Sequence, residues 1–279
     1  MKNILLPTDF SKNSWNAIKY GLDLFKNTPC NFYLLHVTLI SNYTTGDLSL
    51  IANSAAIEKT VLDQAKTALE NLLKDIKKIT KNTNHNFFTI SSYSHFTDAV
   101  KNHIDEKNIE LIIMGTKGAS GLSEIIIGSN TGDLITKVKC PALIIPEKAT
   151  FKNPEEIAFP TDYNIFYQSK ILNSITELAK MYDSTIRILH IAKKDETLTA
   201  SQIENKEFLN SFFMDEKHSF HRITNTKVEA GVQCFVESRD IDMIIMVAKN
   251  LSLFQRILFK PTVEEISYHI EIPFLVLHE

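Results

Sequence analysis

The chain has 279 residues, of which 44% are hydrophobic and 23% charged, and its formal net charge at pH 7 is -3. This length exceeds one typical hydrophobic core and predicts two domains of roughly 140 residues each. The interspersed charges argue against a nucleic-acid surface or a polybasic membrane patch, and no apolar run has the length of a signal peptide or a membrane span.

Strands and helices alternate along the first half. The apolar run at 3–7 predicts a short strand, and Ser11 is a suitable N-cap for the helix that follows. A strand rich enough in apolar residues to be buried on both faces is expected at 31–38, and the spacing of apolar residues predicts a long helix at 51–79. The remaining predicted elements are a strand at 87–91, a helix through Ala99 and Ile104, a strand at 110–114, a helix from Ser129 and a strand at 142–145.

The second half repeats the first. Ile4–Phe10 (ILLPTDF) is matched by Ile157–Tyr163 (IAFPTDY), and Leu35-His36-Val37 is matched by Leu189-His190-Ile191. A constant separation of 132 residues links Met114 to Met246 and Pro141 to Pro273. The break between the copies falls near residues 147–150, so we predict one domain at 1–148 and a second at 149–279.

The duplicated pattern predicts an α/β fold with two doubly wound, Rossmann-like domains, each a five-stranded parallel sheet with helices on both faces. The closing strands at 142–145 and 274–277 are apolar and are expected at sheet edges, where an unpaired strand invites association. We therefore expect these two edges to pair with each other, which would make one chain an intramolecular pseudo-dimer. A further homodimer is left open.

One glycine-rich loop follows the fourth strand of the first copy. Gly115 and Gly118 are separated by two residues, and nine further residues lead to Gly128 and Ser129. Glycines let a backbone approach phosphate oxygens, and the N-terminus of the helix that opens after Gly128 favours an anion. The spacing differs from the P-loop and from the dinucleotide fingerprint. The alternative that these glycines serve only turns and helix caps stays open.

These motifs resemble the universal stress protein family in its tandem, two-domain form. The early Pro7-Thr8-Asp9, the Leu35-His36-Val37 at the end of the second strand and the glycine loop all match. The resemblance implies the adenine nucleotide alpha hydrolase-like variant of the fold, a role in the stress response, and binding of ATP with or without Mg²⁺ or Mn²⁺. It implies that the nucleoside is contacted by Asp9 and Val37, with Met114 as a further site residue. It implies that the phosphates are contacted by the residues of the loop and the helix start: Gly115, Gly118, Gly128, Ser129 and Asn130.

The second copy departs from this loop. Val247, Asn250 and Lys260 replace the three glycines, and Pro261 replaces the serine. A Cβ at each position obstructs close approach of the backbone, and proline supplies no N–H. Phe254 and Phe259 add bulk nearby. We therefore expect nucleotide binding in the first domain only.

Other reactive side chains receive structural interpretations. His36 and His190 end buried strands at equivalent positions and are expected to be hydrogen-bonded core histidines. His218, His221 and Cys234 are possible soft metal ligands, but the two histidines would face opposite sides of a strand, so no metal site is predicted. Three cysteines without a close pair favour a reduced, cytoplasmic chain, with Cys30 and Cys140 as small buried hydrophobes. No Ser-His-Asp order is apparent.

The sequence therefore predicts a cytoplasmic regulator or sensor that binds one adenine nucleotide and presents the segment at 116–127 to an unidentified protein partner. It is not expected to be an enzyme beyond slow ATP hydrolysis, because no base for activating water is apparent. The alternatives are a nucleotide-free scaffold that acts through the second domain and a true ATP hydrolase.

Overall fold

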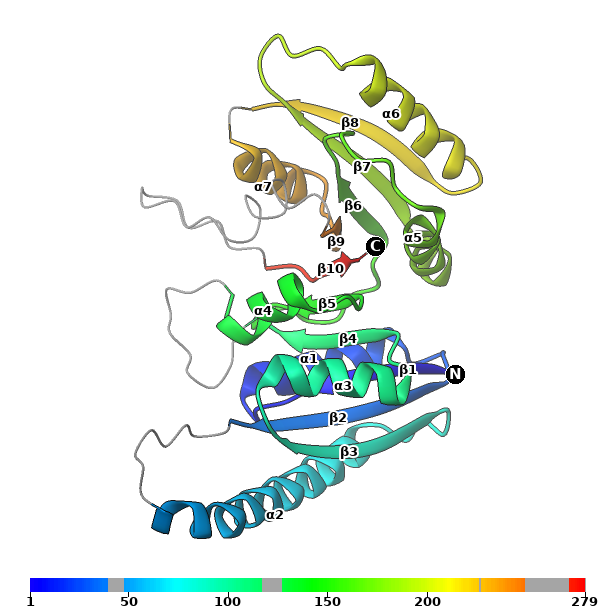
Figure 1. Cartoon of the computed structure of the whole chain (residues 1–279). Coiled ribbons are helices and arrows are strands. Elements are labelled where there is room, and N and C mark those ends of the chain that lie inside the picture. Colours follow the sequence, from blue (N-terminus) through cyan, green and yellow to red (C-terminus); the bar gives the residue numbers. More distant parts are fainter. Residues whose placement is uncertain (40–47, 117–126, 226, 249–270, 279) are drawn as a thin grey trace. The chain divides into compact units, whose positions relative to one another are not determined.

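The computed structural model describes residues 1–39, 48–116, 127–225, 227–248 and 271–278, and the side chains of all these except 48–55 and 57 (Figure 1). The chain forms two compact units that divide between Ala142 and Leu143. Each unit is an α/β assembly, as the alternating strand and helix pattern predicts. None of the helices in the described part of the chain is long and apolar enough to cross a membrane.

The first unit is built on parallel strands. Its elements in chain order are β1 (Lys2–Pro7), α1 (Lys12–Leu24), β2 (Cys30–Thr38), α2 (Leu48–Ile79), β3 (His85–Tyr93), α3 (Phe96–Lys107), β4 (Leu111–Gly115) and α4 (Ser129–Lys137). The strands lie in the order β3-β2-β1-β4, and β1 pairs in parallel with β2 and β4, as β2 does with β3. β5 (Ala142–Ile145) follows α4 at the point where the units divide.

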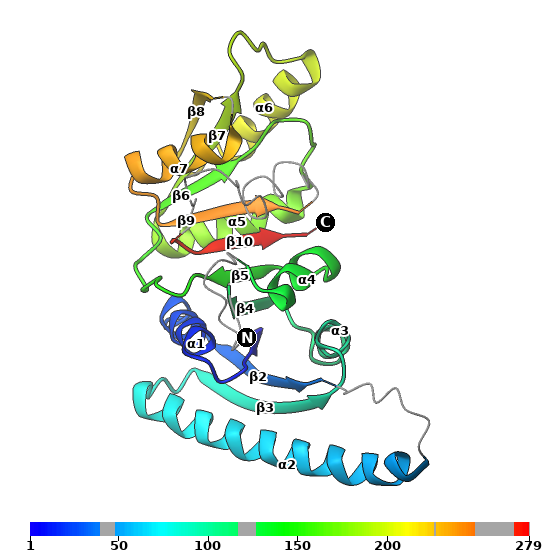
Figure 2. The same ribbon diagram turned by 90° about the vertical axis from the view of Figure 1, so that its left-hand side faces the viewer.

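The centre of this sheet is fully apolar. Ile4, Leu5 and Ile112 are wholly buried, because α1 and α3 lie on opposite sides of the inner strands (Figure 2). The helix α1 packs against β4 at Gly21, where a Cβ would lie 2.9 Å from Ile113 Cδ1. Ser11 caps α1 by accepting a hydrogen bond from the Ser14 N–H at 3.2 Å, as predicted.

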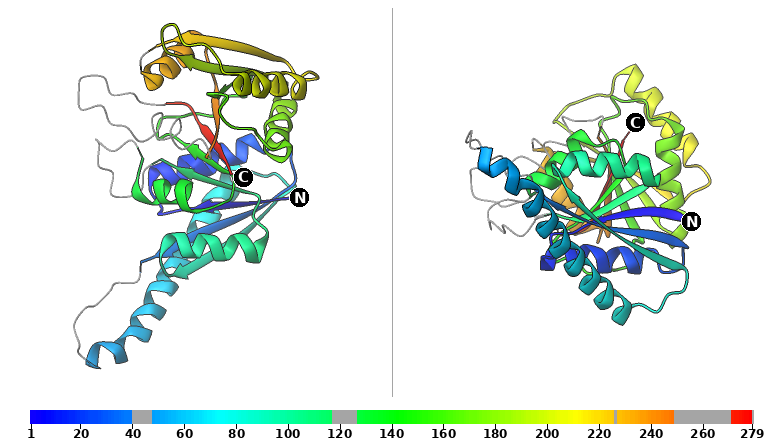
Figure 3. Two further views of the ribbon diagram at one scale, coloured as in Figure 1. Left: turned by 45° about the horizontal axis from the view of Figure 1, so that its top comes forward. Right: turned by 60° about the horizontal axis from the view of Figure 1, so that its bottom comes forward.

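The second unit repeats this arrangement (Figure 3). Its elements are β6 (Glu156–Pro160), α5 (Ser169–Tyr182), β7 (Thr185–Ala192), α6 (Ala200–Phe212), β8 (His218–Thr224), α7 (Val228–Ser238), β9 (Met243–Val247) and β10 (Phe274–Leu277). The strands are parallel in the order β10-β9-β6-β7-β8. The predicted fold class is thereby confirmed, whereas pairing of the two closing strands stays a prediction.

Candidate functional site

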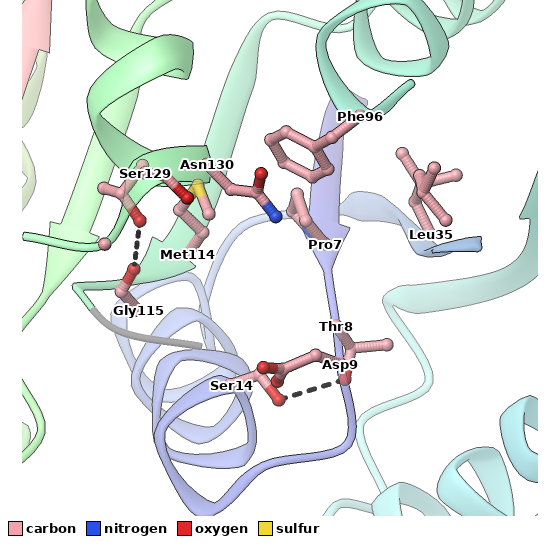
Figure 4. Close-up of a pocket in the computed structure, with 13 residues that line it drawn as sticks. Pro7, Thr8, Asp9, Ser14, Leu35, Phe96, Met114, Gly115, Ser129 and Asn130 are labelled. Carbon is pink, nitrogen blue, oxygen red and sulfur yellow. Dashed lines mark hydrogen bonds between the residues drawn. The ribbon is translucent and has the colours of Figure 1, made fainter. Parts of the chain in front are cut away.

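A pocket in the first unit lies at the carboxyl edge of its sheet. Its walls come from the ends of β1, β2 and β4, the start of α3 and the first turn of α4 (Figure 4). The strand order runs from β1 to β2 and β3 in one direction and to β4 in the other. The pocket therefore lies at the topological switch point, where open α/β sheets bind ligands.

The turn after β1 shapes the floor of the pocket. Phe10 takes a positive φ of 63°, and the Asp9 carboxylate accepts a hydrogen bond from the Ser11 N–H at 3.1 Å. The Thr8 and Ser14 hydroxyl oxygens lie 3.1 Å apart, and both side chains line the pocket. Small hydroxyl groups and one carboxylate at this turn thus line the pocket and leave space between them.

The polar end of the pocket is the start of α4. Gly128 is the N-cap of this helix and has no side chain that could cap it. In the described part of the chain no side-chain cap covers the first N–H groups, which lie beside Ser129 and Asn130. The Gly128 N–H donates to Thr116 O at 2.7 Å, and the Thr131 hydroxyl donates to Gly115 O at 3.0 Å. These two bonds hold the helix N-terminus against the end of β4, in a geometry suited to an anion.

Gly115 is required by packing at the end of β4. A Cβ at this position would lie 2.7 Å from Asn13 Cγ and Oδ1, closer than real Cβ contacts come. Asn13 is buried and bonds the Thr116 hydroxyl at 3.4 Å, so its side chain cannot move aside freely. The first loop glycine therefore serves the packing of β4 on α1 as well as the pocket.

The opposite end of the pocket is apolar. Leu35 and Val37 come from β2, Met114 from β4, and Phe96 from the first residue of α3. Figure 4 shows Ser129 and Gly115 on one side and Phe96 and Leu35 on the other, with Asp9 beside Thr8 and Ser14 in the lower part of the view. A ligand with an aromatic part and an anionic part fits this division.

The structure brings seven of the eight predicted site residues into this one pocket: Asp9, Val37, Met114, Gly115, Gly128, Ser129 and Asn130. The eighth, Gly118, lies outside the described residues, as does Lys117. Sequence reasoning missed Phe96. An aromatic residue that opens the helix after a strand is the signal that would have pointed to it.

The second unit keeps the turn but fills it. Tyr163 takes a φ of 58° at the position that matches Phe10, and its N–H bonds the Thr161 hydroxyl as the Phe10 N–H bonds that of Thr8. Yet the Tyr163 side chain is 2% exposed and Phe10 39%. Burial also raises the pKa of the Tyr163 phenol.

Two features close this region of the second unit. The Thr161 hydroxyl lies 2.9 Å from the hydroxyl of Tyr167, a buried ring that packs on Phe159 with centroids 5.3 Å apart. The helix α6 is anchored over the turn, since the Gln202 and Asn205 side-chain amides donate to the Asp162 and Tyr163 carbonyls, each at 2.8 Å. Val247 ends β9 as a buried side chain, whereas Asn250, Phe254, Phe259, Lys260 and Pro261 lie outside the described residues.

The two strand-end histidines are structural, as predicted. His36 Nδ1 lies 2.8 Å from Thr8 O, and His190 Nδ1 lies 3.0 Å from Thr161 O. Each ring also contacts the aromatic side chain of its turn, with centroids 4.6 Å apart for Phe10 and His36. The histidines therefore hold the turns in shape in both units.

The remaining candidates have no ligand-binding arrangement in the described part of the chain. No group of three or more His, Cys, Asp or Glu side chains there could hold a metal ion. Cys30 and Cys140 are buried, and burial raises the pKa of their thiols to about 11 and about 12. Both thiols therefore stay protonated and unreactive near neutral pH.

Comparisons with known proteins agree with this geometry. The sequence model of the universal stress protein family matches residues 1–146. One universal stress protein of Methanocaldococcus jannaschii is 26% identical over 144 residues, which cover 52% of this chain and 81% of that relative. A second from the same organism is 28% identical over 160 residues, which cover 53% of this chain and 96% of that relative. A solved universal stress protein from Archaeoglobus fulgidus matches with a TM-score of 0.70 at 17% identity, over 99% of this chain and 98% of that one.

The family match covers the unit that contains the pocket, and the structural match extends over both units. The length is about twice that of a single family domain, and the internal repeat shows where the second copy lies. The chain belongs to the universal stress protein family, in a tandem arrangement.

Proposed function

We propose that the first unit binds one adenine nucleotide, ATP in the first instance, and that the chain acts as a cytoplasmic stress-response regulator rather than as an enzyme acting on that nucleotide. The observation that carries the proposal is the division of the pocket into an apolar end and an uncapped helix N-terminus. Phe96, Leu35 and Val37 suit a purine ring, and the start of α4 suits phosphates.

The polar residues of the turn after β1 suit the sugar. The Asp9 carboxylate is an acceptor that ribose hydroxyls can reach, and it is the one acidic side chain among the described lining residues. No described lining residue is a histidine or a second carboxylate that would act as a base on a water molecule. These features support binding over hydrolysis.

The test uses the whole chain. Freshly purified protein is denatured, and the released small molecules are identified by mass spectrometry. Isothermal titration of the ligand-free protein then measures ATP binding with and without Mg²⁺ or Mn²⁺. We expect one site per chain, weakened by Asp9→Ala and by Phe96→Ala. Absence of both released nucleotide and binding heat would instead support a nucleotide-free scaffold, and turnover well above one per minute would support a hydrolase.

A further inference from the structure

A second cluster of reactive side chains lies on β3 and α3, outside the residues that line the pocket. The Ser92 hydroxyl on β3 lies 3.0 Å from Nε2 of His103 on α3. The other ring nitrogen of His103, Nδ1, lies 3.2 Å from Oε2 of Glu106, one helical turn further along. A hydroxyl, an imidazole and a carboxylate are thus joined in one chain of hydrogen bonds.

This order of contacts is the one that activates a serine. A nucleophile and its base must lie about 2.6–3.2 Å apart, and a third group must orient the base. The Glu106 carboxylate accepts a proton only from Nδ1–H, so it selects the tautomer of His103 whose Nε2 accepts the Ser92 proton. The side chain of His103 is 16% exposed and that of Glu106 57%, so the imidazole is held between strand and helix while the carboxylate faces solvent.

From this geometry we propose that Ser92 is a nucleophile for acyl transfer, with His103 as its general base and Glu106 as the residue that positions His103. The substrate class is a small ester with an apolar acyl group. The cluster adjoins the nucleotide pocket, because Ser92 pairs with the lining residue Val37, but none of its three residues lines that pocket. The proposal does not depend on nucleotide binding.

The face of the sheet beside Ser92 suits such an acyl group. Phe88 and Ile90 precede Ser92 at spacings of two residues along β3, so all three side chains are on the same face. Phe88 is 45% exposed and stacks on Tyr33 of β2 with centroids 5.0 Å apart. Phe88 and Ile90 therefore form an apolar surface that extends for about 13 Å along β3 from the Ser92 hydroxyl.

The strand also offers a donor for the oxyanion. The Ser94 N–H bonds Thr38 O of β2, so by the alternation along a parallel strand the Tyr93 N–H is directed away from β2. β3 is the terminal strand in the sheet order of the described residues, so that N–H faces the outer edge beside Ser92. A backbone N–H next to the nucleophile is the usual element of an oxyanion hole.

The reaction is balanced by these groups and water alone. Ser92 Oγ attacks the ester carbonyl carbon and its proton moves to His103 Nε2. The C–O bond to the leaving alcohol then breaks, and His103 returns the proton to that alcohol. Water, deprotonated by His103, attacks the acyl-serine, releases the carboxylic acid and regenerates the serine hydroxyl.

The second unit has other residues at the matching positions of β8 and α7. Ser92 pairs with Val37, and the residue after the matching histidine, Ile191, pairs with Ile223. Ile223 therefore stands in the place of Ser92. On α7, Phe235 packs against His221 with ring centroids 5.0 Å apart. The β3–α3 arrangement is thus a property of the first unit and is not imposed by the repeated fold.

The experiment treats the whole chain with a fluorophosphonate probe and locates the label by peptide mass mapping, alongside hydrolysis of p-nitrophenyl acetate. We expect label on Ser92, loss of label and of hydrolysis above background in Ser92→Ala, and a fall of roughly 100-fold in His103→Ala. Glu106→Gln should reduce the rate only severalfold, because its carboxylate is largely exposed. The matched control is Ser91→Ala, which removes a hydroxyl from the other face of β3 and should leave both readouts unchanged.

A second variant separates chemistry from folding. Ser92→Cys keeps a nucleophile, and its thiol should react with iodoacetamide faster than the exposed Cys234 of the same chain, an advantage that His103→Ala should remove. Absence of label on Ser92, or equal rates in Ser92→Ala and Ser91→Ala with both proteins folded, would overturn the proposal. A Ser92→Cys thiol no faster than Cys234 would count equally against it.

Discussion

The two units share one turn, which lines a pocket in the first unit and is covered by buried side chains in the second. Both place a non-glycine residue at positive φ after the first strand, fix it with a threonine hydroxyl and support it with a histidine bonded to the threonine carbonyl. In the first unit the threonine pairs with Ser14 and leaves a pocket, whereas in the second it pairs with the buried Tyr167. Pro-Thr-Asp therefore specifies the turn in both units, and the neighbouring residues determine whether a pocket forms beside it.

The largest expected effect comes from moving one residue of the second copy into the first. Gly115→Val introduces the residue that the second copy has at the matching position, Val247. Its Cβ alone would lie 2.7 Å from Asn13 Cγ. We expect ATP affinity to fall by roughly 100-fold or more, about 2.7 kcal/mol, in isothermal titration. The reverse change, Val247→Gly, is the matched control and should create no second site. Unchanged affinity in Gly115→Val, or two nucleotides per chain in the parent, would contradict the assignment of a single site to the first unit.

Removal of the hydroxyl partners should affect the units unequally. Tyr167→Ala deletes a buried ring and should destabilise the second unit by about 3–5 kcal/mol, as large aromatic truncations do. Ser14→Ala removes one hydroxyl beside the pocket and should cost the first unit about 1 kcal/mol. Urea unfolding, with hydrogen exchange to assign each transition to its unit, measures both. Equal losses would show that Tyr167 does not fill a space that is open in the first unit.

The amino ends of the strands carry a second contrast. In the first unit three amides form a ladder, since Asn86 donates to Asn31 at 3.0 Å and Asn31 to Asn3 at 2.9 Å. In the second unit Arg187 donates two hydrogen bonds to Glu156, at 2.6 Å and 2.9 Å, and a third to Ser219 at 2.9 Å. One unit therefore uses neutral groups where the other uses an ion pair.

Arg187→Leu should lower the stability of the second unit by about 1–2 kcal/mol, a value discounted because both charged side chains are 28% exposed. Asn31→Leu should cost the first unit about 1 kcal/mol. Salt distinguishes the two, because added NaCl screens an ion pair and leaves an amide ladder unaffected. Thermal unfolding at low and high salt is the measurement, and equal salt dependence in the two variants would contradict this contrast.

The smallest expected effect is a dependence on pH that originates in the second unit. Burial lowers the pKa of His221, and the positive charges of Arg239 and Arg187 lower it further. The negative charge of Glu156 raises this pKa by a smaller amount. Between the lowered folded pKa and the unfolded pKa of about 6.5 the unfolded chain binds more protons, so stability rises with pH through that window and is reduced below it. His221→Gln should flatten this slope in urea midpoints measured from pH 5 to 8. An unaltered slope in His221→Gln would exclude His221 as its source.

Most of the fold was predictable because its signals are local and occur twice. Apolar runs bounded by turn residues located the strands to within about two residues, as at β3, which was expected at 87–91 and extends over His85–Tyr93. The helix α2 begins at Leu48, three residues before its predicted start. Boundaries differ because the last residues of an element depend on contacts across the sheet, which sequence spacing does not show.

The candidate site was predictable where backbone geometry dictates residue type. Gly115 and Gly128 were found because close approach and helix capping require glycine. Phe96 and the Ser92–His103–Glu106 cluster were missed. Each depends on how α3 packs over the sheet, and this packing has no signal in the spacing of residues along the chain. The only local signal for the cluster was a histidine and a glutamate three residues apart on one helix, after a strand that ends in serines.

The filled turn of the second unit has a consequence for the response to ligand. A symmetric pair of pockets in one chain could influence each other, and occupancy would then rise steeply over a narrow range of concentration. With Tyr163 and Tyr167 buried in the second unit, a single chain has one site to fill under our proposal, and its saturation follows a simple hyperbola. The occupancy of such a protein changes gradually with nucleotide concentration and shows no threshold.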